Sequence, residues 1–225
     1  LLATHRELSS AISHELRTPI ARMRFALEML SDTDERAERE RLWTMMEGDL
    51  DELDHLIDTS LTYARFEREA PEPHFSSVHF AEWLRDEVDA VRLLGRDLII
   101  TVDTEKLPEN LGIDVDRKAM PYALRNLLRN AFKYAGRQII VSAELQDAKI
   151  VVHVDDDGIG IPPEDRENVF SAFTRLDRSR DRATGGYGLG LAITRRVLEL
   201  HGGSATADAS PLGGARFTLA WPLTQ

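Results

Sequence analysis

The chain has 225 residues and a formal net charge of −11, from 28 lysines and arginines against 39 aspartates and glutamates. This acidic balance argues against general nucleic-acid binding, because a phosphate backbone is bound by a basic surface. The absence of cysteine excludes a disulfide scaffold, a thiolate zinc site and a thiol nucleophile, and the length predicts one large domain or two of moderate size.

No apolar run approaches the roughly 18 residues that a membrane span requires, and no signal peptide is found. The chain begins with Leu1 and Leu2 rather than with methionine. We therefore expect a soluble piece excised from a longer protein, whose membrane segments would lie outside this piece.

The first 68 residues have the apolar periodicity of two helices that each bury one face. The apolar stripes consist of Leu8, Ile12, Leu16, Ile20, Leu27 and Leu30, and then of Leu42, Met46, Leu50, Leu53, Ile57, Leu61 and Ala64. Residues 31–35 form a polar turn that carries capping residues for the second helix. The pattern predicts a long antiparallel helical hairpin.

A single hairpin of this kind buries too little apolar surface to be stable alone. Two hairpins make a four-helix bundle, so we expect a homodimer through residues 1–68. A coiled-coil spacer without any chemistry has the same periodicity. The apolar pattern does not distinguish these two alternatives.

Residues 69–76 contain two prolines within three residues, which predicts the end of the helix and a stiff linker. From residue 77 onward, strand and helix patterns alternate. Helices are expected at 80–94, 116–135 and 188–200, and strands at 97–103, 138–145, 149–155, 203–208 and 214–221. This alternation predicts an α/β sandwich with its helices on one face of the sheet.

The strongest motif of the first half runs from Ser13 to Pro19. A lone helical histidine is usually a surface or packing residue. His14, however, is followed directly by Glu15, Thr18 lies one helical turn further on, and Pro19 removes a backbone hydrogen bond just past them. A histidine beside an acid on a bent helix suits a side chain that is presented to a partner.

A second motif places polar side chains on the helix expected at 116–135. Asn126 and Asn130 are four residues apart and share a helix face, with Lys133 and Tyr134 about one turn further on. Amide oxygens suit Mg²⁺, an ammonium group suits phosphate, and a tyrosine ring can stack on a base. A helix with an ordinary polar face is an equally good explanation of this motif alone.

Two glycine motifs follow. Asp156, Gly158 and Gly160 come at the end of an expected strand, where a carboxylate could accept a hydrogen bond from an exocyclic amine and the glycines allow a sharp turn against a flat ligand. Gly185–Ile193 opens a helix, and N–H groups at a helix N-terminus form an anion site. Residues 174–184 before it contain four arginines, which suggests a lid over phosphates or a solvated loop.

In this order and spacing, the four motifs resemble those of the sensor histidine kinases of two-component signalling. The residues in these motifs are most similar to those of the class that partners OmpR-type regulators, and residues 181–186 and 214–217 resemble RstB-like kinases. The resemblance covers nearly the whole chain. It implies an α + α/β protein, with a dimerisation and histidine-phosphotransfer domain over 1–68, a linker at 69–76 and a Bergerat-type ATP-binding domain over 77–225.

The resemblance also implies a role for each matching residue. His14 matches the phosphoacceptor, Glu15 the acid that draws a proton from its ring, and Thr18 the hydroxyl that helps to place water for dephosphorylation of the regulator. Asn130 matches a magnesium ligand. The other residues that match the ATP site are Asn126, Lys133, Tyr134, Asp156, Gly158, Gly160, Phe170, Phe173, Arg180, Thr184, Gly186, Gly188, Leu189 and Gly190.

Within that set, Lys133 matches a phosphate contact, Tyr134 a residue that packs on adenine, and Asp156 the aspartate that reads adenine. Phe170 and Phe173 match the segment that anchors the lid. Asp157 and Ile159 stand where asparagine and proline are frequent in the family, and neither difference is expected to remove a contact.

The implied reaction uses ATP and Mg²⁺ to phosphorylate His14, and then transfers the group to an aspartate of a response-regulator receiver domain, with phosphatase activity toward the same regulator. The full-length protein would be anchored in the inner membrane, with this chain on its cytoplasmic side. Two alternatives are another Bergerat-fold ATPase and a dimeric scaffold that binds ATP only to regulate a partner. The ATPases resemble one another in having a glutamate four residues before the motif asparagine, where this chain has Asn126, and an amide is no general base.

Overall fold

The computed structural model describes residues 2–33, 35–68, 73–92, 97–176 and 187–223. The chain divides into two compact units, Leu1–Ala64 and Arg65–Gln225. None of the described helices has an apolar stretch long enough to cross a membrane.

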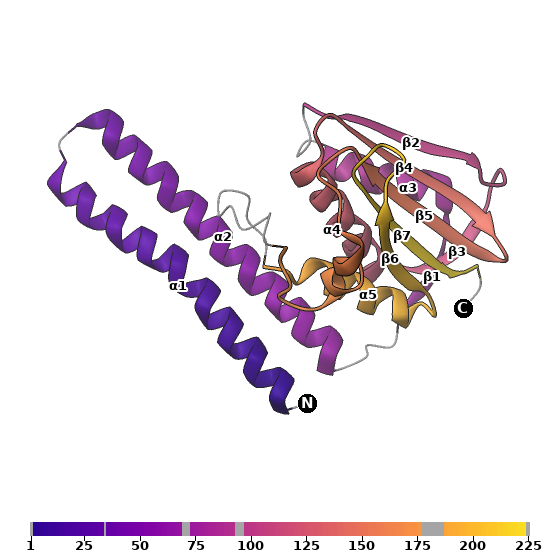
Figure 1. Ribbon diagram of the computed structural model, residues 1–225, viewed down its shortest axis with the longest axis horizontal. Helices are drawn as coiled ribbons and strands as arrows, with labels where there is room; N and C mark the ends of the chain where they lie inside the picture. Colours follow the sequence, from indigo (N-terminus) through magenta and orange to yellow (C-terminus); the bar gives the residue numbers. More distant parts are fainter. Residues whose placement is uncertain (1, 34, 69–72, 93–96, 177–186, 224–225) are drawn as a thin grey trace. The chain divides into compact units, whose positions relative to one another are not determined.

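The helical hairpin consists of α1 (Leu2–Asp32) and α2 (Arg36–Arg68), which run antiparallel beside each other (Figure 1). This arrangement confirms the predicted hairpin. Ala26 and Leu30 of α1 pack against Leu42 and Met46 of α2 close to the turn. Further along the hairpin, Arg22 of α1 donates to Asp49 of α2 over 2.8 Å from Nε to Oδ1, so an ion pair joins the two helices.

The second unit is built on a five-stranded sheet whose strand order is β2-β4-β5-β7-β6 (Figure 1). The strands are β2 (Ile99–Lys106), β4 (Gln138–Gln146), β5 (Lys149–Asp156), β6 (Ser204–Ala209) and β7 (Ala215–Pro222). β2 pairs parallel with β4, and the other neighbours pair antiparallel. The last strand in the sequence thus lies between β5 and β6.

Three helices pack on this sheet, namely α3 (Phe80–Val91), α4 (Ala119–Tyr134) and α5 (Gly190–Leu200). Alternate residues of β4 and β7 are buried, which leaves one face of these strands for the helices and the other partly exposed. The core side chains include Phe80, Leu84, Leu124, Leu127, Leu128, Ile139, Val141, Ile193, Leu198 and Trp221. The predicted α/β sandwich is therefore confirmed.

A second, two-stranded sheet differs from the sequence prediction. β1 (Phe75–His79) pairs antiparallel with β3 (Gly112–Asp116), although no strand is predicted at either place. β1 starts within the residues predicted as linker. α4 starts at Ala119 rather than at residue 116, because Asp116 ends β3 and its carboxylate accepts the backbone N–H groups of Lys118 and Ala119 in the turn before the helix.

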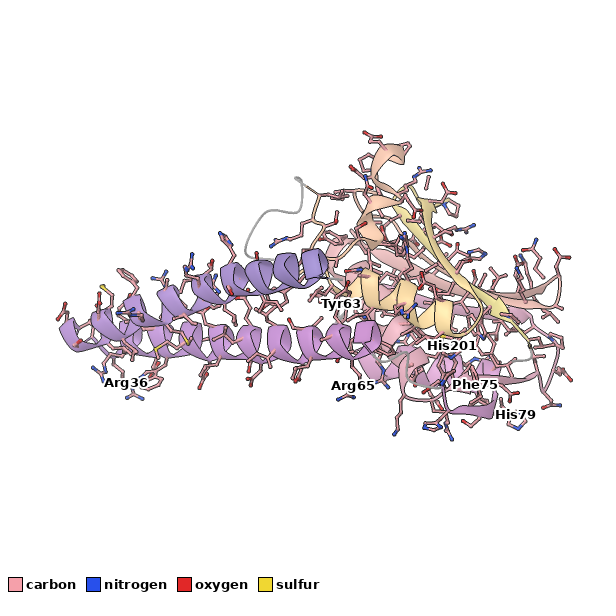
Figure 2. All side chains as sticks on the ribbon, turned by 90° about the horizontal axis from the view of Figure 1, so that it is seen from below. Arg36, Tyr63, Arg65, Phe75, His79 and His201 are labelled. Carbon is pink, nitrogen blue, oxygen red and sulfur yellow. The ribbon has the colours of Figure 1, made fainter. Side chains whose placement is uncertain are left out.

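His201, directly after α5, joins this small sheet to the helices. Its side chain is fully buried, and its Nε2 accepts the backbone N–H of Asp116 over 3.1 Å. The ring proton must therefore lie on Nδ1, which donates to the Val197 carbonyl over 2.8 Å. The ring also meets Phe75 edge-on, with 5.2 Å between centroids (Figure 2). This geometry requires a neutral imidazole.

Burial lowers the pKa of His201, although Val197 and Asp116 oppose the shift. In the unfolded chain the ring titrates near 6.5, so on acidification the unfolded state takes up the proton first. We expect full stability above that pH and a loss as the pH falls from 7 toward 5.5, with a slope of at most about 1.4 kcal/mol per pH unit for one proton. Urea unfolding of His201→Gln should lack this contribution.

Burial lowers the pKa of His153 as well, so His153→Gln is expected to remove a second part of the slope. Each single variant should remove part of the slope, and the double variant should remove most of it. A slope that is unchanged in His201→Gln would contradict the assignment of a buried neutral ring.

Candidate functional site

The helix α4 carries the four polar residues of the second sequence motif and contacts two glycine-containing segments, one at Gly190 and one at Gly158. Near its middle, the buried side chain of Asn126 donates from Nδ2 to the carbonyl of Gly190, the first residue of α5, over 3.3 Å. This bond brings the start of α5 against α4. The free N–H groups at the start of α5 therefore lie beside the asparagine motif.

At the C-terminal end of α4, Tyr134 lies against the loop that follows β5. The approach is so close that a Cβ atom on Gly158 would lie 2.2 Å from the Tyr134 carbonyl oxygen. Only glycine fits there. The Lys133 ammonium lies 4.6 Å from the centre of the Tyr134 ring. Eight residues separate Asn126 from Tyr134, so the two contacts are about 12 Å apart along the helix.

Asp156, the last residue of β5, is buried and held in a fixed orientation. Its Oδ1 accepts the N–H groups of Gly158 over 2.8 Å and of Ala215 over 3.1 Å. Burial raises the pKa of this carboxyl, and the two N–H groups oppose the shift. Because both recorded bonds go to Oδ1, the carboxylate can offer Oδ2 to a ligand.

Gly214, in the turn between β6 and β7, supports Asp156 from a distant part of the sequence. A Cβ atom on Gly214 would lie 2.2 Å from Asp156 Oδ1 and 2.4 Å from the nitrogen of Gly158. The Gly214 N–H also donates to the Asp156 carbonyl over 3.2 Å. Gly214 is not among the predicted site residues, although it begins the stretch 214–217 that carries part of the family resemblance. Gly160 lies beside it, since its own Cβ would be 3.3 Å from the Gly214 oxygen.

The predicted anchoring phenylalanines lie at the entrance to the arginine-rich segment. Phe170 is buried and packs edge-on against Phe217, with 6.2 Å between centroids. Phe173 has a φ of 62°, and its N–H donates to the Gly188 carbonyl over 2.9 Å. This hydrogen bond joins Phe173, before the segment, to Gly188, after it. Leu189, next to Gly188, is fully buried.

Three predicted ATP-site residues, Arg180, Thr184 and Gly186, lie outside the described residues. Asn130 lies on α4 one turn after Asn126 and is partly exposed. Among the residues that the structure describes, no group of three or more histidine, aspartate or glutamate side chains could hold a metal ion. A metal at Asn130 would therefore need ligands from a bound molecule.

The histidine motif lies on α1 in the other unit. The His14 side chain is 77% exposed, and its Nδ1 is 4.0 Å from Glu15 Oε1. Thr18, one turn further on, shares this face of the helix. Pro19 lies within α1, which continues to Asp32. The ring is thus accessible from solvent, with its Nδ1 edge turned toward a carboxylate.

Comparison with known proteins matches both parts of the chain. Residues 4–69 match the family described as the His Kinase A (phospho-acceptor) domain. Residues 115–225 match the family described as histidine kinase-, DNA gyrase B- and HSP90-like ATPases. The chain belongs to the histidine kinases. The chain is 40% identical over 223 residues to the sensor protein RstB of Escherichia coli K12, covering 99% of this chain and 50% of RstB.

Two solved structures resemble the chain along most of its length. Full-length ShkA in complex with AMPPNP is 26% identical, with a TM-score of 0.68, and covers 96% of this chain and 45% of its own. The histidine kinase ThkA, solved in complex with the response regulator protein TrrA, is 23% identical, with a TM-score of 0.79, and covers 99% of this chain and 63% of its own. The chain spans about half the length of RstB.

Proposed function

We propose that the chain is the catalytic portion of a sensor histidine kinase, which transfers the γ-phosphoryl group of ATP to His14 and then to an aspartate of a response regulator. The observation that carries the proposal is an exposed histidine beside a glutamate on a helical hairpin. The same chain has a site in which Asn126 bonds to Gly190, and Tyr134 lies against the loop that follows the buried Asp156. We propose residues 1–68 and 77–225 as the two domains, with 69–76 as the linker.

In this proposal the nucleotide lies along α4. The Oδ2 atom of Asp156 accepts a hydrogen bond from the exocyclic amine of adenine, and Tyr134 packs on the base. Lys133 and the N-terminus of α5 face the phosphates, which the positive end of a helix favours. The related kinase ShkA was crystallised with AMPPNP, which supports ATP as the nucleotide.

Magnesium is proposed to bind at Asn130. The amide oxygen of this partly exposed side chain suits a hard cation, and Mg²⁺ typically takes its remaining ligands from substrate phosphates and water. This requirement agrees with the lack of a protein-only metal cluster among the described residues. The ion would neutralise charge on the phosphates while Asn130 fixes its place.

The phosphoryl group is proposed to bind to Nε2 of His14, because Nδ1 lies on the edge of the ring that faces Glu15. The Nε2 lone pair forms the bond to phosphorus, the bond to the bridging oxygen breaks, and ADP leaves. The imidazole ring, which keeps its proton on Nδ1, then carries a positive charge that the Glu15 carboxylate stabilises. Phosphoryl transfer needs such positioning and charge stabilisation more than covalent help.

Incubation with γ-labelled ATP and Mg²⁺ tests the proposal. We expect a label on the chain that is lost in acid and retained in base, as for phosphohistidine. ATP binding without any label would instead support the dimeric scaffold. Steady ATP hydrolysis without a phosphorylated intermediate would support the ATPase alternative.

The regulator is proposed to dock on the face of α1 that carries His14 and Thr18. Phe25 and Met29 follow at helical spacing on that face and are 60% and 36% exposed. An exposed phenylalanine on the same helix face as the reactive histidine provides an apolar anchor for a partner. Thr18 would serve the proposed phosphatase reaction on the same surface.

We expect Phe25→Asp to slow phosphotransfer to the regulator about tenfold or more, since a hot-spot aromatic contributes at least about 2 kcal/mol. Autophosphorylation should stay unchanged. The matched control, Phe25→Leu, keeps an apolar side chain and should retain most of the transfer rate. Equal transfer rates in wild type and Phe25→Asp would contradict this docking face. Transfer is measured as loss of label from the kinase after addition of the regulator.

The homodimer is proposed to form through a separate stripe of exposed apolar residues. Trp43, Leu50 and Ile57 of α2 are seven residues apart and are 53%, 52% and 46% exposed, and Ile20 of α1 is also exposed. A repeat of seven residues is typical of a seam between helices. This stripe lies on the opposite side of α2 from Met45.

Leu50→Asp should weaken the dimer at least about a hundredfold, because two carboxylates would be buried in the seam. Sedimentation velocity over a range of concentrations measures the effect. Met45→Asp is the control, since Met45 is also exposed but lies off the stripe. A dimer that survives Leu50→Asp, or that dissociates equally in Met45→Asp, would reject this seam.

We propose that the full-length protein is anchored in a membrane and that this chain is its cytoplasmic part. The support is that the chain covers 50% of a relative that is named as a sensor protein.

A further inference from the structure

Asp157 makes an unusual set of hydrogen bonds next to the adenine-facing residues. Its Oδ1 accepts three successive backbone N–H groups, those of Gly136 over 2.9 Å, Arg137 over 3.0 Å and Gln138 over 3.1 Å. Gly136 and Arg137 lie in the turn between α4 and β4, and Gln138 is the first residue of β4. One carboxylate oxygen thus organises a whole turn.

The Asp157 oxygen fixes the directions of the three N–H groups and so the conformation of the turn. Gly136 and Arg137 are exposed, and without Asp157 their N–H groups would turn to water and leave the turn free to change conformation. The same N–H groups, those of Arg137 and Gln138 before that of Gly136, hold the pKa of the Asp157 carboxyl below its ordinary value. Hydrogen bonding to the charged form explains this direction.

Asp157 is adjacent in the sequence to a residue of the proposed adenine site, and its hydrogen bonds lead to another. The residue directly before it is Asp156, and the turn that it binds begins two residues after Tyr134. Its bonds therefore join the two segments that carry the carboxylate and the aromatic ring of the adenine end. The Tyr134 carbonyl, two residues before Gly136, is the group that approaches Gly158 so closely that only glycine fits there.

We propose that Asp157 is a positioning residue that sets the spacing between Tyr134 and the Asp156 carboxylate, and thereby the selectivity of the site for adenine. The inference rests on the proposed nucleotide-binding function. Asp157 itself touches no substrate in this arrangement. It acts through the α4–β4 turn.

The experiment compares autophosphorylation of the wild type, Asp157→Ala and Asp157→Asn with ATP and with GTP, at varied nucleotide concentration. In Asp157→Ala we expect the KM for ATP to rise about tenfold or more, with kcat within twofold of wild type. The KM for GTP should change much less, so the ratio of kcat/KM for ATP to kcat/KM for GTP should fall. Asp157→Asn retains an Oδ1 acceptor for all three N–H groups and should restore the KM for ATP to within about threefold of wild type.

Three results would overturn the inference. They are an unchanged KM for ATP in Asp157→Ala, an equal rise in KM for both nucleotides, and an Asp157→Asn variant as impaired as Asp157→Ala. If Asp157→Ala does not fold, as judged by circular dichroism, Asp157→Ser takes its place, because its shorter side chain cannot reach all three donors.

Failure of the inference is distinguishable from failure of the proposed function. Calorimetric titration of the wild-type chain with ATP and Mg²⁺ reports on the function alone, and a chain that neither binds ATP nor labels His14 overturns both. A wild type that binds ATP together with an Asp157→Ala variant of equal affinity overturns only the role of Asp157.

Discussion

Replacement of His14 by glutamine is expected to abolish ATP-dependent labelling of the chain and to leave ATP binding unchanged. Glutamine is polar and of similar size, but its amide nitrogen has no free lone pair that could attack phosphorus. The side chain is 77% exposed, so the substitution should change the free energy of unfolding by less than about 0.5 kcal/mol. The loss of label would thus report on chemistry and not on folding.

His79 offers the matched control, because it is an exposed histidine at the end of β1 (Figure 2). His79→Gln should take up label at the wild-type rate. Phosphorylation is measured with γ-labelled ATP, and binding by calorimetry with ATP and Mg²⁺. Label that persists in His14→Gln would show that another residue accepts the phosphoryl group.

The second large effect is expected for Gly158→Ala, which should weaken ATP binding about a hundredfold or more. The added Cβ atom would lie 2.2 Å from the Tyr134 oxygen, 2.8 Å from its carbonyl carbon and 2.9 Å from Asp156 Oδ1. The first two are backbone atoms, so no rotamer change relieves the overlap. The loop must move away from α4, which separates the two groups proposed to hold adenine.

Gly136→Ala is the control for this prediction. A Cβ atom on Gly136 would have its nearest neighbour at 3.7 Å, which is an ordinary contact, and the residue lies in the same part of the site. We expect its ATP affinity to remain within about threefold of wild type. A Gly158→Ala variant that binds ATP as Gly136→Ala does would show that adenine does not lie between Tyr134 and Asp156.

The elements with long apolar repeats could be predicted from the sequence, because local periodicity determines them. The hairpin helices, α5 and the strands β4, β5 and β7 agree with prediction to within about two residues at most ends. β1 and β3 could not be predicted in this way. Each has five residues, and their pairing joins Phe75 to Asp116, so the partner that stabilises each strand is remote in the sequence.

The same distinction holds for the candidate site. The motif residues were recognisable because each group lies within one helix or turn. The supports of Asp156 were not, since Gly214 and Ala215 come from a hairpin about 60 residues further on. Asn126 is a related case, because the sequence places it in the candidate ATP site beside Asn130, whereas its bond to Gly190 appears only in the structure.

The position of β7 has a consequence for how the protein is made. β7 is the last strand of its sheet to be synthesised, yet it pairs with β5 on one side and β6 on the other. Until β7 leaves the ribosome, β5 has an unpaired edge that invites association with other chains. Both strands of the hairpin that supports Asp156 also emerge late. The helices of the N-terminal unit can therefore form early in synthesis, whereas the nucleotide site is assembled in a single late step.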